Sequence, residues 1–288
     1  MLDSSLDKLA EYAIRAMIYE VSITPKPGLV DRCNCGAHSD MNFFTFIDSS
    51  VVVGSYLKKM TVASNRCDIE LNVLLQSVRQ IGLDAEEAMF QVTGGVNTQK
   101  GLIFLLGCVC SVCGWMLAHG DVINARGIAS NLRKMLQGIC ETELNTKDAS
   151  ALRTAGAMIY AQSGIRGVRG EAESGLPSVL EIALPTLRKL LGEGVPFEAA
   201  ALQALLALMT SVDDTTVINR GGLKALEYMK NQAETYLETG GVKADEGYIL
   251  LKDIDFQFIC RGISPGGCSD LLAVTLFIYF VEADEMLQ

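Results

Sequence analysis

The sequence lacks several features that would identify its class directly. It has only two histidines, His38 and His119, and no paired Cys-X-X-Cys motifs, so its nine cysteines do not form a recognisable zinc site. The cysteines are odd in number and have no framework spacing, which argues against a disulfide-stapled secreted domain and favours reduced thiols. Only six prolines occur in 288 residues, and no low-complexity stretch or internal repeat is present. The chain therefore has no long linker.

Basic residues are also scarce. The sequence has 24 Lys and Arg against 34 Asp and Glu, which gives a net charge of −10. Nucleic-acid binding needs clustered Lys and Arg, so no nucleic-acid partner is expected. A few cations in a cleft can still hold a small anion, and a polyphosphate on an acidic protein usually brings Mg²⁺ with it.

The start of the chain, MLDSSLDKLAEYAIRAM, lacks the basic segment and apolar run of a signal peptide. The uncharged run over residues 101–118 only just reaches the length of roughly 18 residues expected of a membrane span. It contains glycines and has no second run beside it, which favours a buried core helix. We therefore expect a cytoplasmic protein with no membrane partner.

Helical periodicity dominates the sequence. Apolar residues at 6, 9, 10, 13, 14, 17 and 18 form one face of a helix. Similar stripes predict helices over 43–60, 70–81, 101–119, 122–138, 149–162, 179–191, 197–212, 223–239 and 270–282. No run alternates between apolar and polar residues as a strand would. The sequence thus predicts a single all-α domain over residues 1–288, with buried central helices and a site in the loops between helices.

Five of the predicted loops are unusually rich in glycine and charge: 24–40, 93–100, 164–177, 213–222 and 261–270. The first contains Lys26, Asp31, His38 and Asp40, and it follows Glu20 at the end of the first helix. A histidine titrates near neutral pH and can transfer a proton or bind a phosphate. A loop histidine can equally be held by hydrogen bonds alone.

The loop over 93–100 has the composition of an anion site. Gly94 and Gly95 allow the backbone to approach a ligand closely. Asn97 and Lys100 then precede the long apolar helix, and a helix N-terminus with a nearby lysine attracts phosphate. The spacing is not that of a Walker A motif, and an ordinary capped turn has the same residues.

The third loop places Arg166 and Arg169 beside Glu171 and Glu173. Arginine forks suit phosphate or carboxylate, whereas the two glutamates can orient the arginines or bind a metal. A solvated, self-paired charge cluster has the same appearance in sequence.

The last two loops contain carboxylates next to helix ends. Asp214 follows an apolar helix, where a negative charge is locally unfavourable, and Arg220 opens the next helix. Ser264 and Gly266 form a tight turn before Asp270, which either complements the helix dipole or binds Mg²⁺.

Together these loops have a specific order. EVSITPKPGLVDRCNCGAHSDM, TGGVNTQKGLIF, GVRGEAESGLPSV, DDTTVINRGG and ISPGGCSDLLAVT follow one another over residues 20–275. In this they resemble the triphosphoribosyl-dephospho-CoA synthase family, which includes the proteins serving citrate lyase and malonate decarboxylase. The resemblance implies an all-α transferase that joins ATP and 3′-dephospho-CoA and releases adenine, with the triphosphate retained in the product.

The resemblance also suggests roles for the loop residues. The candidate catalytic residues are Glu20, Asp31, His38, Asp40 and Glu171. The candidate phosphate and nucleotide ligands are Lys26, Gly94, Gly95, Asn97, Lys100, Arg166, Arg169, Arg220, Ser264 and Gly266. The candidate ligands of Mg²⁺ are Glu173, Asp214 and Asp270.

Three positions depart from the usual family pattern. Gln99 replaces a histidine, Thr216 replaces an asparagine, and Gly262 replaces another asparagine. These changes keep two alternatives open: a divergent member with another acceptor, and a nucleotide-binding protein with impaired catalysis. The sequence also leaves open whether the protein forms a homo-oligomer.

Overall fold

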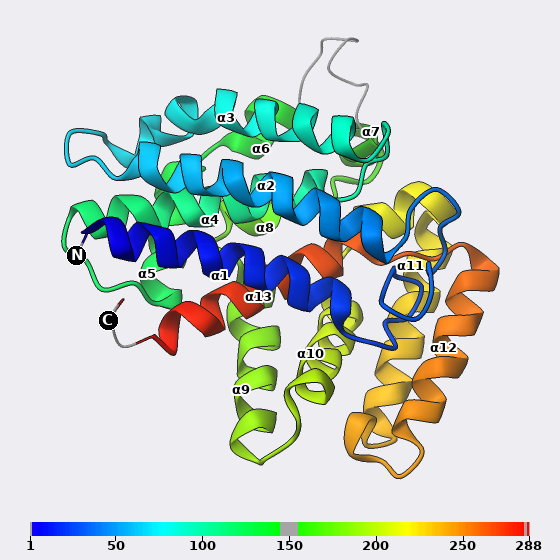
Figure 1. The fold of residues 1–288 in the computed structure, drawn as a ribbon. Helices are drawn as coiled ribbons and strands as arrows, with labels where there is room; N and C mark the ends of the chain where they lie inside the picture. The colour runs from blue at the N-terminus through cyan, green and yellow to red at the C-terminus, as the bar shows by residue number, and fades with distance from the viewer. Residues whose placement is uncertain (1, 145–154, 285–286, 288) are drawn as a thin grey trace.

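The computed structural model describes residues 2–144, 155–284 and 287, and helices make up almost all of its regular structure (Figure 1). In chain order the elements are α1 (Leu2–Ser22), α2 (Phe43–Ser64), α3 (Leu71–Val92), α4 (Lys100–Ala118), α5 (Ala125–Met135), α6 (Ile139–Leu144), α7 (Ala155–Ser163), α8 (Gly167–Glu173), the π-helical turn η2 (Val179–Ala183), α9 (Leu184–Gly192), α10 (Phe197–Ser211), α11 (Thr215–Glu238), the 3₁₀ turn η3 (Gly241–Lys243), α12 (Gly247–Arg261) and α13 (Gly266–Glu282). The described residues contain no strand, so the predicted all-α fold is confirmed.

Local chemistry explains where several helices begin. The side chain of Asn42 accepts a hydrogen bond from the amide of Thr45, and the hydroxyl of Thr45 accepts one from the amide of Asn42. This capping box satisfies two of the amides that a helix N-terminus leaves free. Asn124 caps α5 in a similar way, and Asp214 caps α11.

The helices form two groups that run in different directions in Figure 1. In one group α2 packs against α1, α3 and α4, and α13 packs against α1 and α4. In the other group α10 packs against α9, α11 and α13, and α11 packs against α12. The N-terminal ends of α4, α11 and α13 lie where the two groups meet.

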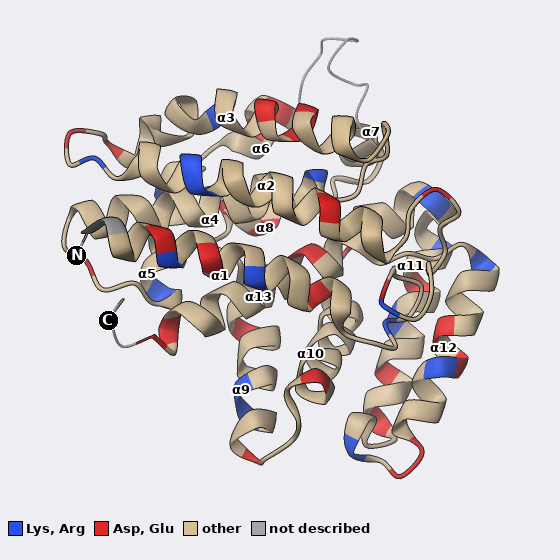
Figure 2. Cartoon of the chain, in the orientation of Figure 1, with Lys and Arg blue, Asp and Glu red and all other residues tan. Residues whose placement is uncertain are grey.

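Helix α4 forms the centre of the core. Only Lys100 carries a charge in it, and Figure 2 shows its ribbon almost free of charged residues. Among the described helices α4 alone is long and apolar enough to cross a membrane, although the bent pair α10 and α11 would also qualify if counted as one span. The surrounding helices bury 72% of the apolar window of α4, so it packs as the predicted core helix.

The structure differs from the predicted helices in several places. Helix α3 continues to Val92 because Gly82 has ordinary helical geometry and does not end it. Helix α8 occupies part of the predicted loop 164–177, helix α11 begins at Thr215 inside the predicted loop 213–222, and α6 and α12 were not predicted at all. The predicted helix 149–162 begins outside the described residues, and its described part is α7.

Candidate active site

A cavity of about 190 Å³ lies where the loop between α1 and α2 meets the N-terminal ends of α4, α11 and α13. We refer to it as the central cavity. Its walls bring together candidates from three of the five loops and from the end of α1: Glu20, Lys26, His38, Asn97, Lys100, Ser264, Gly266 and Asp270. Residues distant in sequence therefore line one space.

Three helix N-termini border this cavity. Lys100 and Gly101 are the first residues of α4, Thr215 and Thr216 of α11, and Gly266 of α13. A helix N-terminus carries partial positive charge and amide donors, so three of them around one cavity favour an anion there. The arrangement suits a phosphorylated ligand on an otherwise acidic protein.

A buried ion pair forms one wall. The ammonium of Lys26 contacts the carboxylate of Glu20, and the two side chains are only 1% and 4% exposed. The hydroxyl of Ser269, on α13, donates to the same carboxylate oxygen. Because an ion pair this deeply buried needs partners for both charges, Glu20 is fixed in place and holds Lys26 at the cavity.

Asp270 lies one residue beyond Ser269 and faces the N-terminus of α4. Its carboxylate makes no hydrogen bond or ion pair with the described residues. Burial raises its pKa well above the ordinary value, and the nearby charges of Glu20 and Asp214 raise it further. An unpaired carboxyl group with a raised pKa in a cavity is a good candidate for proton transfer.

Two glycines allow α13 to begin close to α11. A Cβ at Gly266 would come within 3.2 Å of the hydroxyl oxygen of Thr216, and one at Gly267 within 3.1 Å of the carboxylate of Asp214. The carboxylate of Asp214 accepts the amide of Cys268 at 2.8 Å and caps α11 through the amides of Thr216 and Val217. Asp214 thus joins the two helix ends.

His38 also lines the central cavity. Its Nε2 atom lies 2.8 Å from the hydroxyl of Ser264, and Nδ1 lies 3.6 Å from the carboxylate of Asp40. Burial lowers the pKa of the imidazole, and the guanidinium of Arg220 lowers it further. Both effects favour the neutral imidazole, which can hydrogen-bond a ligand or accept a proton.

Gln99, one of the three departures from the expected family pattern, is only 2% exposed. Its Oε1 accepts the hydroxyl of Ser49 at 2.6 Å, and its Nε2 donates to the hydroxyl of Ser50 at 3.1 Å. Both serines are on α2. The amide side chain is thus fixed by two partners and braces the start of α4.

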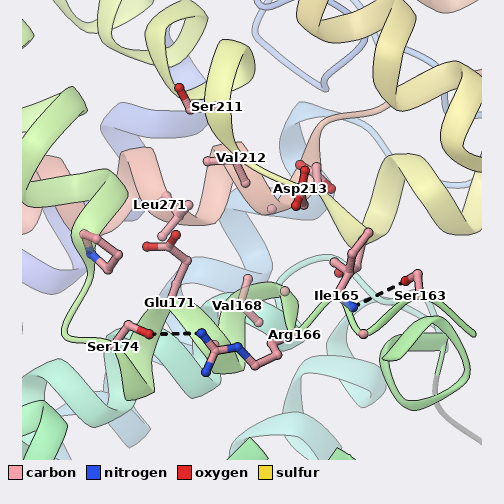
Figure 3. A pocket seen from close by; sticks show the side chains of 17 residues that line it. Ser163, Ile165, Arg166, Val168, Glu171, Ser174, Ser211, Val212, Asp213 and Leu271 are labelled. Atoms are coloured by element: carbon pink, nitrogen blue, oxygen red, sulfur yellow. Dashed lines mark hydrogen bonds between the residues drawn. The ribbon is translucent and has the colours of Figure 1, made fainter. Parts of the chain in front are cut away.

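A second cavity, of about 450 Å³, lies beside α8, and we refer to it as the α8 cavity. Figure 3 shows Arg166 and Glu171 approaching from the α8 side and Ser211, Val212 and Asp213 from the end of α10. Glu171 accepts the hydroxyl of Ser178 at 2.6 Å, and burial raises its pKa.

A third cavity, of about 320 Å³, lies between α3 and α4, and we refer to it as the α3–α4 cavity. It contains Asn97, Lys100 and Arg169 in its walls. Val168 and Thr215 line all three cavities, so the three spaces adjoin at these two residues.

Several predicted site residues lie outside these cavities. The buried carboxylate of Asp31 accepts four hydrogen bonds from its own loop: the Thr24 hydroxyl and the amides of Lys26, Cys33 and Asn34, at 2.6 to 3.0 Å. It shapes the loop that presents Lys26. Asp40 is exposed and touches the site only through His38.

Arg220 also lies outside the cavities. Its guanidinium donates to the backbone carbonyls of Gly262, at 2.9 Å, and Ala37. It therefore fastens two loops together, in place of the predicted phosphate contact. Gly94 and Gly95 are exposed, line none of the three cavities, and have φ of 66° and 91°, so they turn the chain between α3 and α4.

The predicted Mg²⁺ ligands do not form one site. The carboxylate of Glu173 accepts the amide of Gly138 at 2.8 Å and pairs with Arg166 at 3.3 Å. Asp214 uses its carboxylate to cap α11 and bind the amide of Cys268. No group of three or more His, Cys, Asp or Glu side chains suited to a metal occurs in residues 2–144 and 155–284. Glu173, Asp214 and Asp270 therefore do not fit a metal centre of their own.

The sequence did not single out Val168, Thr215, Ser269 and Gly101 as site residues. Thr215 follows the capping residue Asp214, and Ser269 precedes Asp270, so both were adjacent to predicted candidates. The signal in the sequence that could have identified these residues was their closeness to a helix N-terminus.

The fold and the cavities define an all-helical protein in which polar loops and three helix N-termini meet at one internal site. Comparison with known sequences gives the family: the chain belongs to the ATP:dephospho-CoA triphosphoribosyl transferase family, whose sequence profile matches residues 6–287. It is a transferase of that family.

Two curated proteins from Vibrio cholerae serotype O1 are 42% identical to it over 277 residues. They come from strain M66-2 and strain ATCC 39315 / El Tor Inaba N16961, and both are named probable 2-(5''-triphosphoribosyl)-3'-dephosphocoenzyme-A synthase. The matches cover 96% of this chain and 88% of each relative. No solved structure matches the chain.

Proposed function

We propose that this chain transfers the 5-triphosphoribosyl group of ATP to the 2′-hydroxyl of 3′-dephospho-CoA and releases adenine. The observation that carries the proposal is the unpaired Asp270 carboxyl group beside three helix N-termini, with Lys26 and Lys100 in the same cavity. Two anionic substrates have to meet at one carbon, and the three adjoining cavities offer room for both.

The reaction breaks one bond and forms one. The acceptor oxygen bonds to C1 of the ATP ribose, the bond from that carbon to adenine breaks, and the electron pair leaves with adenine. Positive charge develops on the ribose, as it does in glycoside hydrolysis, and a nearby carboxylate stabilises it.

Asp270 is the residue we assign to the acceptor proton. Its raised pKa makes it a stronger base than an ordinary aspartate once it is ionised. The released adenine takes up a proton, for which neutral His38 and its partner Ser264 offer a hydrogen-bonding path. Glu20 acts indirectly, by holding Lys26.

The triphosphate is retained in this reaction, so its ligands have to bind it without cleaving it. Lys26 and the helix N-termini of the central cavity suit that role because their charges are fixed before the substrate arrives. Arg166 lines the adjoining α8 cavity and is available to the remaining phosphates. Mg²⁺, if used, would arrive with the triphosphate.

The product would serve as the precursor of the prosthetic group of citrate lyase or malonate decarboxylase, in the cytoplasm. The alternatives are another acceptor or a protein that binds nucleotide without turnover, both suggested by Gln99.

Incubation of the purified protein with ATP and dephospho-CoA tests the proposal. We expect free adenine by chromatography, and a product whose mass equals the sum of both substrates minus adenine. Adenine that appears only with another acceptor would support the divergent member. ATP binding without adenine would support the impaired protein, and release of ADP, phosphate or pyrophosphate would contradict the proposal.

A further inference from the structure

The α3–α4 cavity has a shape and lining unlike those of the other two. Its α3 wall is formed by Leu75, Val78, Gly82, Leu83 and Glu86, which recur at helical spacing on one face of the helix. Its α4 wall is likewise one face, from Lys100 to Cys108. An α-helix rises about 1.5 Å per residue, so the eight residue steps from Lys100 to Cys108 make this wall about 12 Å long.

Most of these walls are apolar. Met60, Ile103 and Phe104 complete the lining, and burial raises the pKa of Cys108 to about 12, so its thiol is uncharged. Gly82 and Gly107 leave room for the side chain of Met60, which a Cβ at these positions would approach to 3.1 and 2.7 Å. The cavity suits a long uncharged group.

The charged side chains that line the α3–α4 cavity form ion pairs. Lys100, which pairs with Glu86 at 2.6 Å, lines both this cavity and the central cavity, so it marks their junction. Glu143 pairs with Arg79 and Arg169, each at 2.8 Å. The guanidinium of Arg169 lies 5.2 Å from the ring centre of Phe104.

We infer that the α3–α4 cavity binds the pantetheine arm of the acceptor, with the acceptor diphosphate at Lys100 and Arg169. This inference rests on the proposed function, since it concerns the substrate dephospho-CoA. In that molecule a diphosphate separates the reacting ribose from a long uncharged arm. In the protein, the central cavity is followed by Lys100 and then by the α3–α4 cavity, which is the same order as ribose, diphosphate and arm in the substrate.

A nucleobase is a poorer occupant. The edge of adenine needs neutral hydrogen-bonding partners, whereas most of the polar side chains in this lining are charged: Arg79, Glu86, Lys100, Glu143 and Arg169. An arm with two amides and a thiol places most of its surface on carbon and sulfur, which the apolar walls match.

Filling the cavity tests the inference. Gly82→Leu projects a side chain from the middle of the α3 wall, and we expect the KM for dephospho-CoA to rise at least tenfold while the KM for ATP stays within twofold. Leu83→Trp is a second filling variant. Position 83 should tolerate the larger side chain because Leu83 is 50% exposed. Gln80→Leu, on the exposed side of α3, is the matched control and should leave both values unchanged.

A rise in the KM for ATP alone, or no change in either KM with both filling variants folded, would overturn the inference. Calorimetric titration with dephospho-CoA separates this outcome from failure of the proposed function. If the unmodified protein releases no adenine, the proposed function fails. A tenfold loss of dephospho-CoA affinity in Gly82→Leu would still support the binding site, and unchanged affinity would reject it.

Discussion

The Oδ2 atom of Asp270 lies directly against the backbone of Gly101, so that a Cβ at position 101 would come within 2.2 Å of it. Gly101 is the second residue of α4, and Asp270 is in the first turns of α13. The carboxyl group that we assign to proton transfer thus depends on a missing side chain in a neighbouring helix.

Gly101→Ala should lower turnover at least 100-fold, because the new methyl group has to displace the carboxyl group of Asp270. The helix itself should not suffer, since alanine has a better helix propensity than glycine by roughly 1 kcal/mol. Adenine release and thermal unfolding measured together test this. Gly192→Ala is the control, as nothing lies within 4 Å of its Cβ position. Full activity in Gly101→Ala would contradict the proposed position of the base.

The raised pKa of Asp270 makes a prediction about stability. The folded protein binds the proton of this group more tightly than the unfolded chain does. Its contribution to stability is therefore fully present below the unfolded pKa, near 3.8, and is lost as the pH rises through the raised folded pKa. The charges that face it are the carboxylates of Glu20 and Asp214 and, through Glu20, the ammonium of Lys26.

Asp270→Asn should therefore unfold at a higher temperature than the unmodified protein at pH 8, because asparagine does not ionise. The difference should shrink as the pH falls toward 4. Melting temperatures across that range measure it. The opposite result would be a variant that loses stability relative to the unmodified protein as the pH rises from 4 to 8. That result would mean that a partner stabilises the ionised carboxylate of Asp270.

Asp31→Ala should lower both stability and activity, because the loop loses its four hydrogen bonds and Lys26 is no longer held. Leaving buried donors unpaired costs about 1–3 kcal/mol for each group, so a loss of at least 2 kcal/mol in the free energy of unfolding is expected in a urea titration. Asp40→Asn is the comparison, since the Asp40 side chain is 60% exposed and should change stability by less than about 0.5 kcal/mol. An Asp31→Ala protein with normal stability and no turnover would assign the aspartate to the chemistry instead.

Two substitutions at position 99 test how the fold accommodates glutamine there. Gln99→His should retain turnover within about tenfold, because a neutral imidazole has one acceptor and one donor nitrogen for Ser49 and Ser50. Gln99→Leu leaves both hydroxyls without this partner and should destabilise the protein by roughly 1–3 kcal/mol. Equal stability of the two variants would show that the bracing contacts are unimportant.

The periodicity of apolar residues predicted most helices because most pack one face on the core. Helix α12 was missed since its pattern mixes buried and exposed apolar residues: Leu251 and Phe258 are buried, whereas Ile249 and Phe256 are more than half exposed. Helix α8 was missed because its sequence, GVRGEAE, has the glycine content of a loop. Neither α8 nor α12 therefore has a clear stripe of apolar residues in its sequence.

The site was predicted less completely than the fold. Residue type and loop position identified Lys26, His38, Lys100 and Asp270, which the structure brings to one cavity. The same signals selected Arg220, whose side chain holds backbone carbonyls instead. Only packing decides which charged loop residues face the cavity, and a single sequence does not contain the packing.

Single-turnover adenine release by Asp270→Asn is the most direct test of the central claim. With saturating ATP and dephospho-CoA, we expect the rate to fall at least 1,000-fold while calorimetry shows both substrates bound within threefold of their normal affinity. A variant that releases adenine at near-normal rate would show that the reaction does not use this carboxyl group.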